Sequence, residues 1–173
     1  MSEPTLLKFK LMRPGAIVPS RATDGSGAFD FYAPEDGFLD PGEKQLIPSG
    51  VAHDMPGLMR VPIMIPPGYG TVLDMEAMTA GFIPVKLQGI LFDRSGLGGK
   101  KGIRLSFNGL IDNDYRGEIL LSIINDSPNP FSWKQGDRLC QLGYTLMYAS
   151  NAFETAVLSE SNRGAGGFGS TGK

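Results

Sequence analysis

The chain has 173 residues, 41% of them hydrophobic and 20% charged, a composition that suits one globular domain with its own core. A formal net charge of −2 offers no basic surface for duplex nucleic acid, so we expect no direct nucleic-acid partner. The single cysteine, Cys140, excludes an intramolecular disulfide, and no apolar run is long enough for a signal sequence or membrane span, so we expect a soluble, cytoplasmic protein with no membrane partner.

The 24 glycines and 13 prolines separate short apolar runs, as is typical of an all-β protein. No stretch keeps a helical apolar period over several turns. We predict strands at residues 6–12, 29–33, 44–51, 59–65, 84–92, 103–107, 118–125, 138–148 and 153–157. The run 118–125 is mostly apolar, which predicts burial on both faces. Many short strands in one domain indicate a jelly-roll-like or barrel fold.

The last eleven residues, RGAGGFGSTGK, match two phosphate-binding patterns, G-x-G-x-x-G and G-x-x-x-x-G-K. Both patterns need a strand before the loop and a helix after it, and no helix follows in this sequence. What remains is a set of glycine N–H groups, two hydroxyls, a guanidinium and an aromatic ring, all of which suit a nucleotide. A simple flexible tail is the alternative.

Four further stretches carry the residue types that a nucleotide site requires, although each alone is a weak signal. They are GSGAFDFYA with Asp30, DRSGLGGKKG with Arg94, Ser95 and Gly96, NGLIDNDYRGE with Asp112 and Tyr115, and QGDRLCQLG with Asp137, Arg138 and Gln141.

Together and in this order, the five stretches resemble the five motifs of the homotrimeric dUTPase family (dUTP diphosphatases). The resemblance implies an all-β, jelly-roll-like (β-clip) subunit in a threefold ring, with a flexible C-terminal arm. Residues 1–161 would form a single domain and residues 162–173 a lid. The reaction would convert dUTP to dUMP and pyrophosphate, with Mg²⁺ on the triphosphate, at sites shared between subunits. It would limit uracil in DNA and supply dUMP for dTMP synthesis.

The third motif implies the catalytic and sugar-contacting residues. Asp112 would be the general base that activates water for attack on the α-phosphorus. Tyr115 would pack against the deoxyribose and exclude a 2′-hydroxyl. The hairpin at residues 103–111 would recognise uracil through its backbone. The base-contacting set is Ser106, Asn108, Gly109, Leu110, Ile111 and Leu120, with the choice between Ser106 and Asn108 left open.

The other motifs imply the triphosphate and metal contacts. Arg94, Ser95 and Gly96 would hold the α- and β-phosphates with the help of Gln141. Asp30 would order waters around Mg²⁺, which takes most of its remaining ligands from substrate phosphates. In the lid, Arg163 would pair with the γ-phosphate and Phe168 would cover uracil, while Gly169, Ser170 and Thr171 would complete the closure.

Two charged residues next to these motifs carry expectations of their own. Arg138 is expected to be structural, pairing within the trimer or with Asp137. Asp93 precedes the arginine of the second motif, where its charge would be unfavourable unless it is paired.

The stretch between the first two motifs is longer than the family pattern, with extra residues at about 53–60 and 71–88. Five of the eight methionines lie between residues 55 and 78. They suit either core packing or an adaptable contact surface. Residues 55–90 are therefore a possible site for a protein partner.

Two other functions compete with this interpretation. A dCTP deaminase on the same fold would be expected to use a glutamate near the base, and a non-catalytic regulatory trimer would act through the insertion. The single histidine, His53, is expected to be a surface or strand residue, and Cys140 a core residue. We find no Cys/His cluster for zinc.

Overall fold

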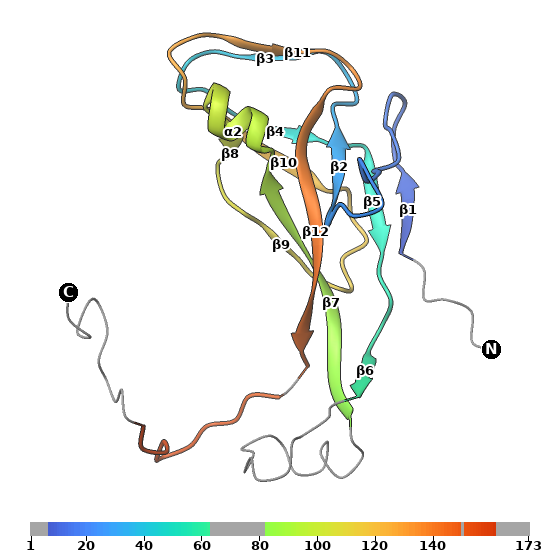
Figure 1. The fold of residues 1–173 in the computed structure, drawn as a ribbon, viewed down its shortest axis with the longest axis vertical. Helices are drawn as coiled ribbons and strands as arrows, with labels where there is room; N and C mark the ends of the chain where they lie inside the picture. The colour runs from blue at the N-terminus through green and yellow to red at the C-terminus, as the bar shows by residue number, and fades with distance from the viewer. Residues whose placement is uncertain (1–6, 63–81, 150, 162–173) are drawn as a thin grey trace.

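The computed structural model describes residues 7–62, 82–149 and 151–161, in which β-strands predominate and one short helix occurs (Figure 1). The elements are β1 (Lys8–Leu11), β2 (Ala28–Tyr32), β3 (Gly37–Leu39), β4 (Lys44–Pro48), β5 (Val51–Asp54), β6 (Met59–Pro62), β7 (Phe82–Asp93), α2 (Ser95–Lys101), β8 (Ile103–Leu105), β9 (Leu110–Ile111), β10 (Leu120–Asn125), β11 (Phe131–Trp133) and β12 (Arg138–Tyr148). The expected all-β class is confirmed. No helix among the described residues is long and apolar enough to span a membrane.

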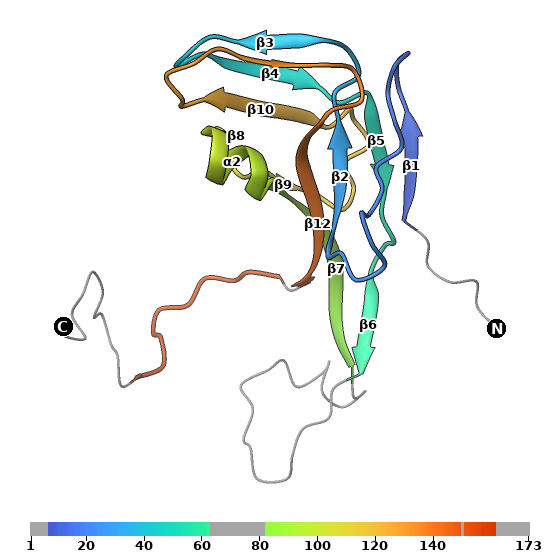
Figure 2. The ribbon, with the colours of Figure 1, turned by 45° about the horizontal axis from the view of Figure 1, so that its top comes forward.

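The strands form antiparallel pairs throughout. The largest sheet has the order β2-β12-β7-β6, and β9 pairs with β7 beside it. A second sheet has the order β4-β10-β8, and two further pairs are β1-β5 and β11-β3. In Figure 2, β3, β4, β10 and β11 run across the end of the upright strands β2, β5 and β12. This topology brings motifs from distant parts of the sequence onto neighbouring strands.

The core lies between these sheets and is built from alternating strand residues. Phe31 of β2, Leu121 of β10 and Leu142 of β12 are fully buried. Cys140 also lies in this core, as expected, and burial raises the pKa of its thiol. In β10, Leu121, Ser122, Ile123 and Asn125 are all buried, so the prediction of burial on both faces holds for most of this strand.

The chain breaks between β4 and β5, where a single strand at residues 44–51 was expected. Gly50 has a φ of +74°, and a Cβ on it would lie 2.4 Å from the Cβ of Ala16. The left-handed backbone ends one strand and redirects the chain, so β5 pairs with β1 while β4 pairs with β10.

The predicted strand at residues 153–157 is wrong. Residues 151–161 form no strand and are exposed, and Figures 1 and 2 show this segment leaving the body of the molecule. Phe153 and Val157 are exposed because no other described strand lies beside them. Alternating residues alone do not make a strand without a partner.

The helix α2 was also not expected, since SGLGGKK contains three glycines. Burial of Leu97 fixes one face of the helix. Lys100 and Lys101 lie in the last turn, where positive charges interact favourably with the helix dipole. Gly102 ends the helix with a φ of 67° and donates its backbone N–H to the carbonyl of Leu97.

The predicted insertion falls partly on described residues. Strands β6 and β7 pair from Met59 opposite Val85 to Pro62 opposite Phe82 and so form the two arms of a hairpin. Residues 63–81, among them Met64, Met75 and Met78, lie outside the described residues. Met55 is buried, which agrees with core packing for this methionine.

Candidate functional site

The third motif forms a tight turn that follows strand β9. Ile111 and Leu110 of β9 pair with Gly89 and Ile90 of β7, which fixes the chain up to the residue before Asp112. The turn then closes through a hydrogen bond from the Tyr115 backbone N–H to the Asp112 carbonyl at 3.1 Å. The side chains of Asp112 and Tyr115 therefore emerge from one short, defined piece of backbone.

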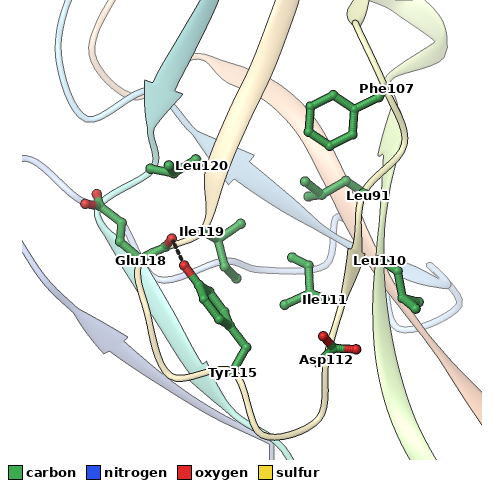
Figure 3. Close-up of a pocket in the computed structure, with 10 residues that line it drawn as sticks. Leu91, Phe107, Leu110, Ile111, Asp112, Tyr115, Glu118, Ile119 and Leu120 are labelled. Carbon is green, nitrogen blue, oxygen red and sulfur yellow. Dashed lines mark hydrogen bonds between the residues drawn. The ribbon is translucent and has the colours of Figure 1, made fainter.

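A pocket of about 220 Å³ opens beside this turn (Figure 3). Its walls are mainly apolar and come from strand β7, the loop before β9, β9 itself and the start of β10. The lining residues are Leu91, Phe107, Gly109, Leu110, Ile111, Asp112, Tyr115, Glu118, Ile119 and Leu120. An apolar pocket with a few converging polar groups is the usual form of a small-molecule site.

The pocket has two carboxylates, and they differ in their surroundings. Glu118 accepts two hydrogen bonds from Arg13, at 2.8 and 2.7 Å, and one from the Gly50 N–H at 2.6 Å. These hydrogen bonds lower the pKa of Glu118, and hydrogen bonding to Arg13 has the largest effect. The Asp112 side chain is exposed, and no described residue donates a hydrogen bond to it. Asp112 is therefore the carboxylate with lone pairs free for a substrate or water.

Tyr115 is held in a fixed orientation at the pocket wall. Its hydroxyl donates to the Glu118 carbonyl at 2.9 Å, as the dashed line in Figure 3 shows. A Cβ on Gly117 would lie 2.4 Å from that hydroxyl oxygen, so a larger residue at position 117 would displace the Tyr115 ring. The ring can thus serve as a rigid wall.

A second polar cluster centres on Asp30, which is only 2% exposed. Arg138 donates to its Oδ2 at 3.0 Å, and Gln141 donates to its Oδ1 at 3.1 Å. Arg94 Nε lies 3.2 Å from Oδ1 as an ion pair, and Arg94 Nη1 donates to the Arg138 carbonyl at 3.2 Å. The register of β2 and β12 sets Asp30 opposite Gln141, and the pairing of β12 with β7 sets Cys140 opposite Asp93, the residue before Arg94. Three motifs therefore meet here.

This cluster changes the expectations for two residues. Arg138 pairs with Asp30, not with Asp137, whose carboxylate accepts the backbone N–H of Lys134 at 2.8 Å. Asp93 forms no ion pair among the described residues, but its Oδ1 accepts a hydrogen bond from the backbone N–H of Leu105 at 2.6 Å. The carboxylate of Asp93 thereby ties the end of β7 to β8.

The structure brings together only part of the predicted site. Gly109, Leu110, Ile111, Asp112, Tyr115 and Leu120 line the pocket, whereas Arg94, Ser95, Gly96 and Gln141 do not. Ser106 and Asn108 are also absent from the lining, and the Ser106 hydroxyl lies 2.6 Å from that of Ser122. Arg163, Phe168, Gly169, Ser170 and Thr171 lie outside the described residues.

Sequence reasoning missed four lining residues. Leu91 and Ile119 are apolar strand or strand-flanking residues that a sequence does not distinguish from core. Phe107 is an exposed aromatic in a loop, a signal that points to a binding surface. Glu118 is the last residue of the third motif, but nothing in the sequence predicts its pairing with Arg13.

His53 lies on strand β5, one of the two expected alternatives, and is buried with 2% exposure. Its Nδ1 lies 3.0 Å from the Tyr144 hydroxyl, while no described residue pairs with Nε2. The described residues contain no group of three or more His, Cys, Asp or Glu side chains able to hold a metal. A dedicated protein cage for a cation is thus absent from this part of the chain.

An apolar pocket, a free carboxylate at its rim and a separate arginine cluster are together the features of a β-fold protein that binds a phosphorylated small molecule. A profile of the dUTPase family matches residues 59–172. A deoxyuridine 5′-triphosphate nucleotidohydrolase of Nautilia profundicola is 34% identical over 168 residues, which cover 96% of this chain and 99% of the relative. The corresponding protein of Clostridium tetani is 34% identical over 174 residues, the full length of both chains. The chain therefore belongs to the dUTPase family.

Solved structures share the fold. The dUTPase of Staphylococcus bacteriophage 80alpha, solved with dUpNHpp, superposes with a TM-score of 0.73 at 23% identity and covers 97% of this chain and 99% of its own. The dUTPase of phage phi11 of S. aureus, solved as a mutant that reveals coordination of a structural Mg(II) ion, has a TM-score of 0.67 at 19% identity, covering 90% of this chain and 99% of its own.

Proposed function

We propose that this protein is a dUTP diphosphatase, which hydrolyses dUTP to dUMP and pyrophosphate by attack of water on the α-phosphorus. The observation that carries the proposal is the pocket in which Asp112, free of protein partners among the described residues, lies on the same turn as the fixed ring of Tyr115. Membership of the dUTPase family supplies the substrate. The reaction would limit uracil in DNA and supply dUMP for dTMP synthesis.

Asp112 acts as the general base in this mechanism. A water molecule needs to lose a proton as it attacks phosphorus, and an aspartate within hydrogen-bond reach accepts it. The other carboxylate of the pocket, Glu118, is unsuited to this role because Arg13 and Gly50 occupy its oxygens and lower its pKa. The difference between the two carboxylates supports the choice of Asp112.

The pocket also accounts for selection of a deoxyuridine. Uracil contacts the backbone around Gly109 and Leu110, and Phe107 and Leu120 contribute to the walls. A thymine methyl group would need room that a close-fitting hairpin lacks, and cytosine would leave buried backbone groups mispaired. Tyr115 meets the sugar face and leaves no space for a 2′-hydroxyl. Of the two open candidates, Ser106 has its hydroxyl beside that of Ser122, which favours Asn108 or backbone contacts alone.

The triphosphate is bound by the arginine cluster and the start of α2. Arg94 offers charge-assisted hydrogen bonds to phosphate oxygens, with Ser95 and Gly96 beside it and Gln141 assisting. Asp30 holds Arg94 and Gln141 in place, since its buried carboxylate contacts both. Their fixed positions lower the entropic cost of orienting the phosphates.

Magnesium enters with the nucleotide as Mg–dUTP. Magnesium keeps several waters and takes other ligands from phosphates, so the lack of an acidic cage among the described residues suits this arrangement. Asp30 is the one buried carboxylate at the phosphate cluster and would accept hydrogen bonds from metal-bound water. The bound ion supplies charge neutralisation on the triphosphate.

The working enzyme is a homotrimer with sites shared between chains, and residues 162–173 close over the substrate. Pocket and phosphate cluster do not share lining residues within one chain, which supports a composite site. Residues 162–173 lie outside the described residues, and their proposed roles are those that the resemblance implies: Arg163 would contact the γ-phosphate, Phe168 would cover uracil, and Gly169, Ser170 and Thr171 would complete the contacts. We place the enzyme in the cytoplasm, with the precursors of DNA, and keep residues 55–90 as a possible surface for a protein partner.

The proposal is tested by the Asp112→Asn variant, which keeps the shape of the side chain but removes the base. We expect kcat for Mg–dUTP to fall by a factor of about 10² to 10⁴, while binding of a non-hydrolysable dUTP analogue persists. Pyrophosphate release at fixed enzyme concentration measures the loss, and circular dichroism checks the fold. Wild-type protein that releases no pyrophosphate from dUTP would refute the proposed activity.

Assays of dUTP and dCTP for both pyrophosphate and ammonia separate the alternatives. A dCTP deaminase would release ammonia from dCTP, but the glutamate that lines the pocket is fully engaged by Arg13 and Gly50, which weighs against this chemistry. A regulatory trimer without catalysis would bind dUTP and release neither product.

A further inference from the structure

The turn that carries Asp112 has a buried amide at its next position. Asn113 is only 9% exposed, whereas its neighbours Asp112 and Asp114 are exposed. The Asn113 side-chain nitrogen donates to two backbone carbonyls, that of Pro56 at 2.7 Å and that of Leu87 at 3.0 Å. An amide NH₂ has two hydrogens, so both donors are satisfied in this position.

These two carbonyls belong to the root of the β6–β7 hairpin. Pro56 lies in the short link between β5 and β6, and Leu87 lies within β7. Strand β9 pairs with β7 only at Ile111 and Leu110, so its backbone ladder ends before Asp112. The side chain of Asn113 then continues the attachment of the chain to β7 where the ladder stops.

A second tie on the same turn is weaker because it is exposed to water. Arg116 pairs with Asp54 at 2.8 Å, and their side chains are 50% and 48% exposed. Arg116 also donates to the carbonyls of Asn113 and Tyr115, at 2.8 and 3.0 Å. Exposed ion pairs contribute little, whereas a buried amide that bridges two carbonyls fixes the backbone around it.

We propose that Asn113 is a positioning residue for catalysis, which fixes the direction of the Asp112 carboxylate by fastening the turn to the root of the β6–β7 hairpin. The inference rests on the proposed role of Asp112. No described side chain bonds to the Asp112 carboxylate, so its direction depends on the backbone that carries it. Displacing a catalytic group by about 1 Å can cost on the order of a hundredfold in rate.

The test is the Asn113→Asp variant, which keeps the size of the side chain but sets carboxylate oxygens against the two carbonyls. Asn125→Asp is the matched control. Asn125 is fully buried and its amide also donates to two carbonyls, those of Leu39 and Asn129, but it lies at the end of β10 and not on the turn that carries Asp112. Both variants lose buried hydrogen bonds, and only Asn113→Asp alters the turn that carries the base.

We measure kcat and KM for Mg–dUTP at a temperature where circular dichroism shows both variants folded. Asn113→Asp is expected to lower kcat about 10- to 100-fold and to change KM less than about threefold, since Asn113 does not line the pocket. Asn125→Asp is expected to keep kcat within about threefold of wild type. If Asn113→Asp does not fold, Asn113→Ser, which removes the amide bridge without adding charge, is measured with the same expectation.

Two results would overturn the inference while the proposed function stands. One is a folded Asn113 variant with wild-type kcat alongside an inactive Asp112→Asn variant. The other is an equal loss of kcat in Asn113→Asp and Asn125→Asp, which would assign a merely structural role. A wild-type protein inactive on dUTP would instead refute the underlying function, so the two failures are distinguishable.

Discussion

At the scale of single residues, His53 shows how burial sets the charge of a side chain. Its burial lowers the pKa of the imidazole, and the nearby charge of Arg116 lowers it further, while Asp54 opposes the shift. The ring therefore stays neutral in the folded protein, with Nδ1 beside the Tyr144 hydroxyl. Because the chain has one histidine, few other side chains titrate in the same range.

Stability is predicted to fall as the pH drops below about 6.5, the ordinary pKa of histidine. The unfolded chain binds a proton on His53 at that pH and the folded chain does not, so protonation favours unfolding. The contribution is fully present above about pH 7.5 and is lost toward the lower pKa of the folded state, with a slope of at most about 1.4 kcal/mol per pH unit. Urea unfolding of wild type and His53→Asn between pH 5.5 and 7.5 measures it. Equal slopes in the two proteins would contradict the prediction.

At the scale of elements, the N-terminal end of helix α2 contributes to the candidate phosphate site and is not optimised for capping the helix. The N-cap residue is Arg94, which makes no side-chain capping bond because its guanidinium turns to Asp30 and the Arg138 carbonyl. Serine, threonine or aspartate would cap the helix better. Arg94 departs from the usual N-cap preference. Such a departure is expected at a candidate phosphate site, where binding and not stability determines the residue. The stability that the N-cap does not provide is then expected to come from the C-terminal end of the helix.

The Gly102→Ala variant should therefore destabilise the fold. Gly102 has a φ of 67°, and a Cβ would lie 3.2 Å from the Ser127 backbone nitrogen, so alanine is expected to cost about 1–2 kcal/mol. Gly99→Ala is the control, because Gly99 lies within the helix and nothing comes within 4 Å of its Cβ position. That change should stabilise by up to about 1 kcal/mol. Urea unfolding at one protein concentration compares them, and equal effects of the two alanines would argue against the C-cap role.

The elements also show what a sequence can and cannot predict. Strands such as β2, β10 and β12 were predictable because apolar runs stand between glycines and prolines. The run at residues 153–157 has a similar pattern but no partner strand in the described part of the chain, and β3, β9 and β11 are too short to show a period.

The candidate site likewise has one part that the sequence predicts and one part that it does not. Asp112 and Tyr115 could be named as site candidates because both lie in the third motif, whose resemblance to the dUTPase family implies their roles. The Asp30 cluster needs the pairing of β2 with β12, which no local pattern gives.

At the scale of the whole molecule, the described part of a single chain has features of an incomplete assembly. Large apolar side chains from separate strands remain exposed, among them Leu46, Phe92 and Leu146. The pocket with Asp112 contains none of the phosphate-binding candidates. Exposed apolar surface on several strands favours association with other copies, and closed symmetric assemblies are the common result.

A mixing experiment tests whether two chains build one site. Arg94→Ala and Asp112→Asn are each expected to be nearly inactive alone, since one lacks a phosphate ligand and the other the base. If each site takes Asp112 from one chain and Arg94 from its neighbour, random trimers of equal amounts contain intact sites at about one quarter of the wild-type level. The two variants are unfolded, mixed and refolded, and pyrophosphate release is compared with each variant and wild type treated alone. Activity no higher than the sum of the two separate variants would mean that both residues act within one chain.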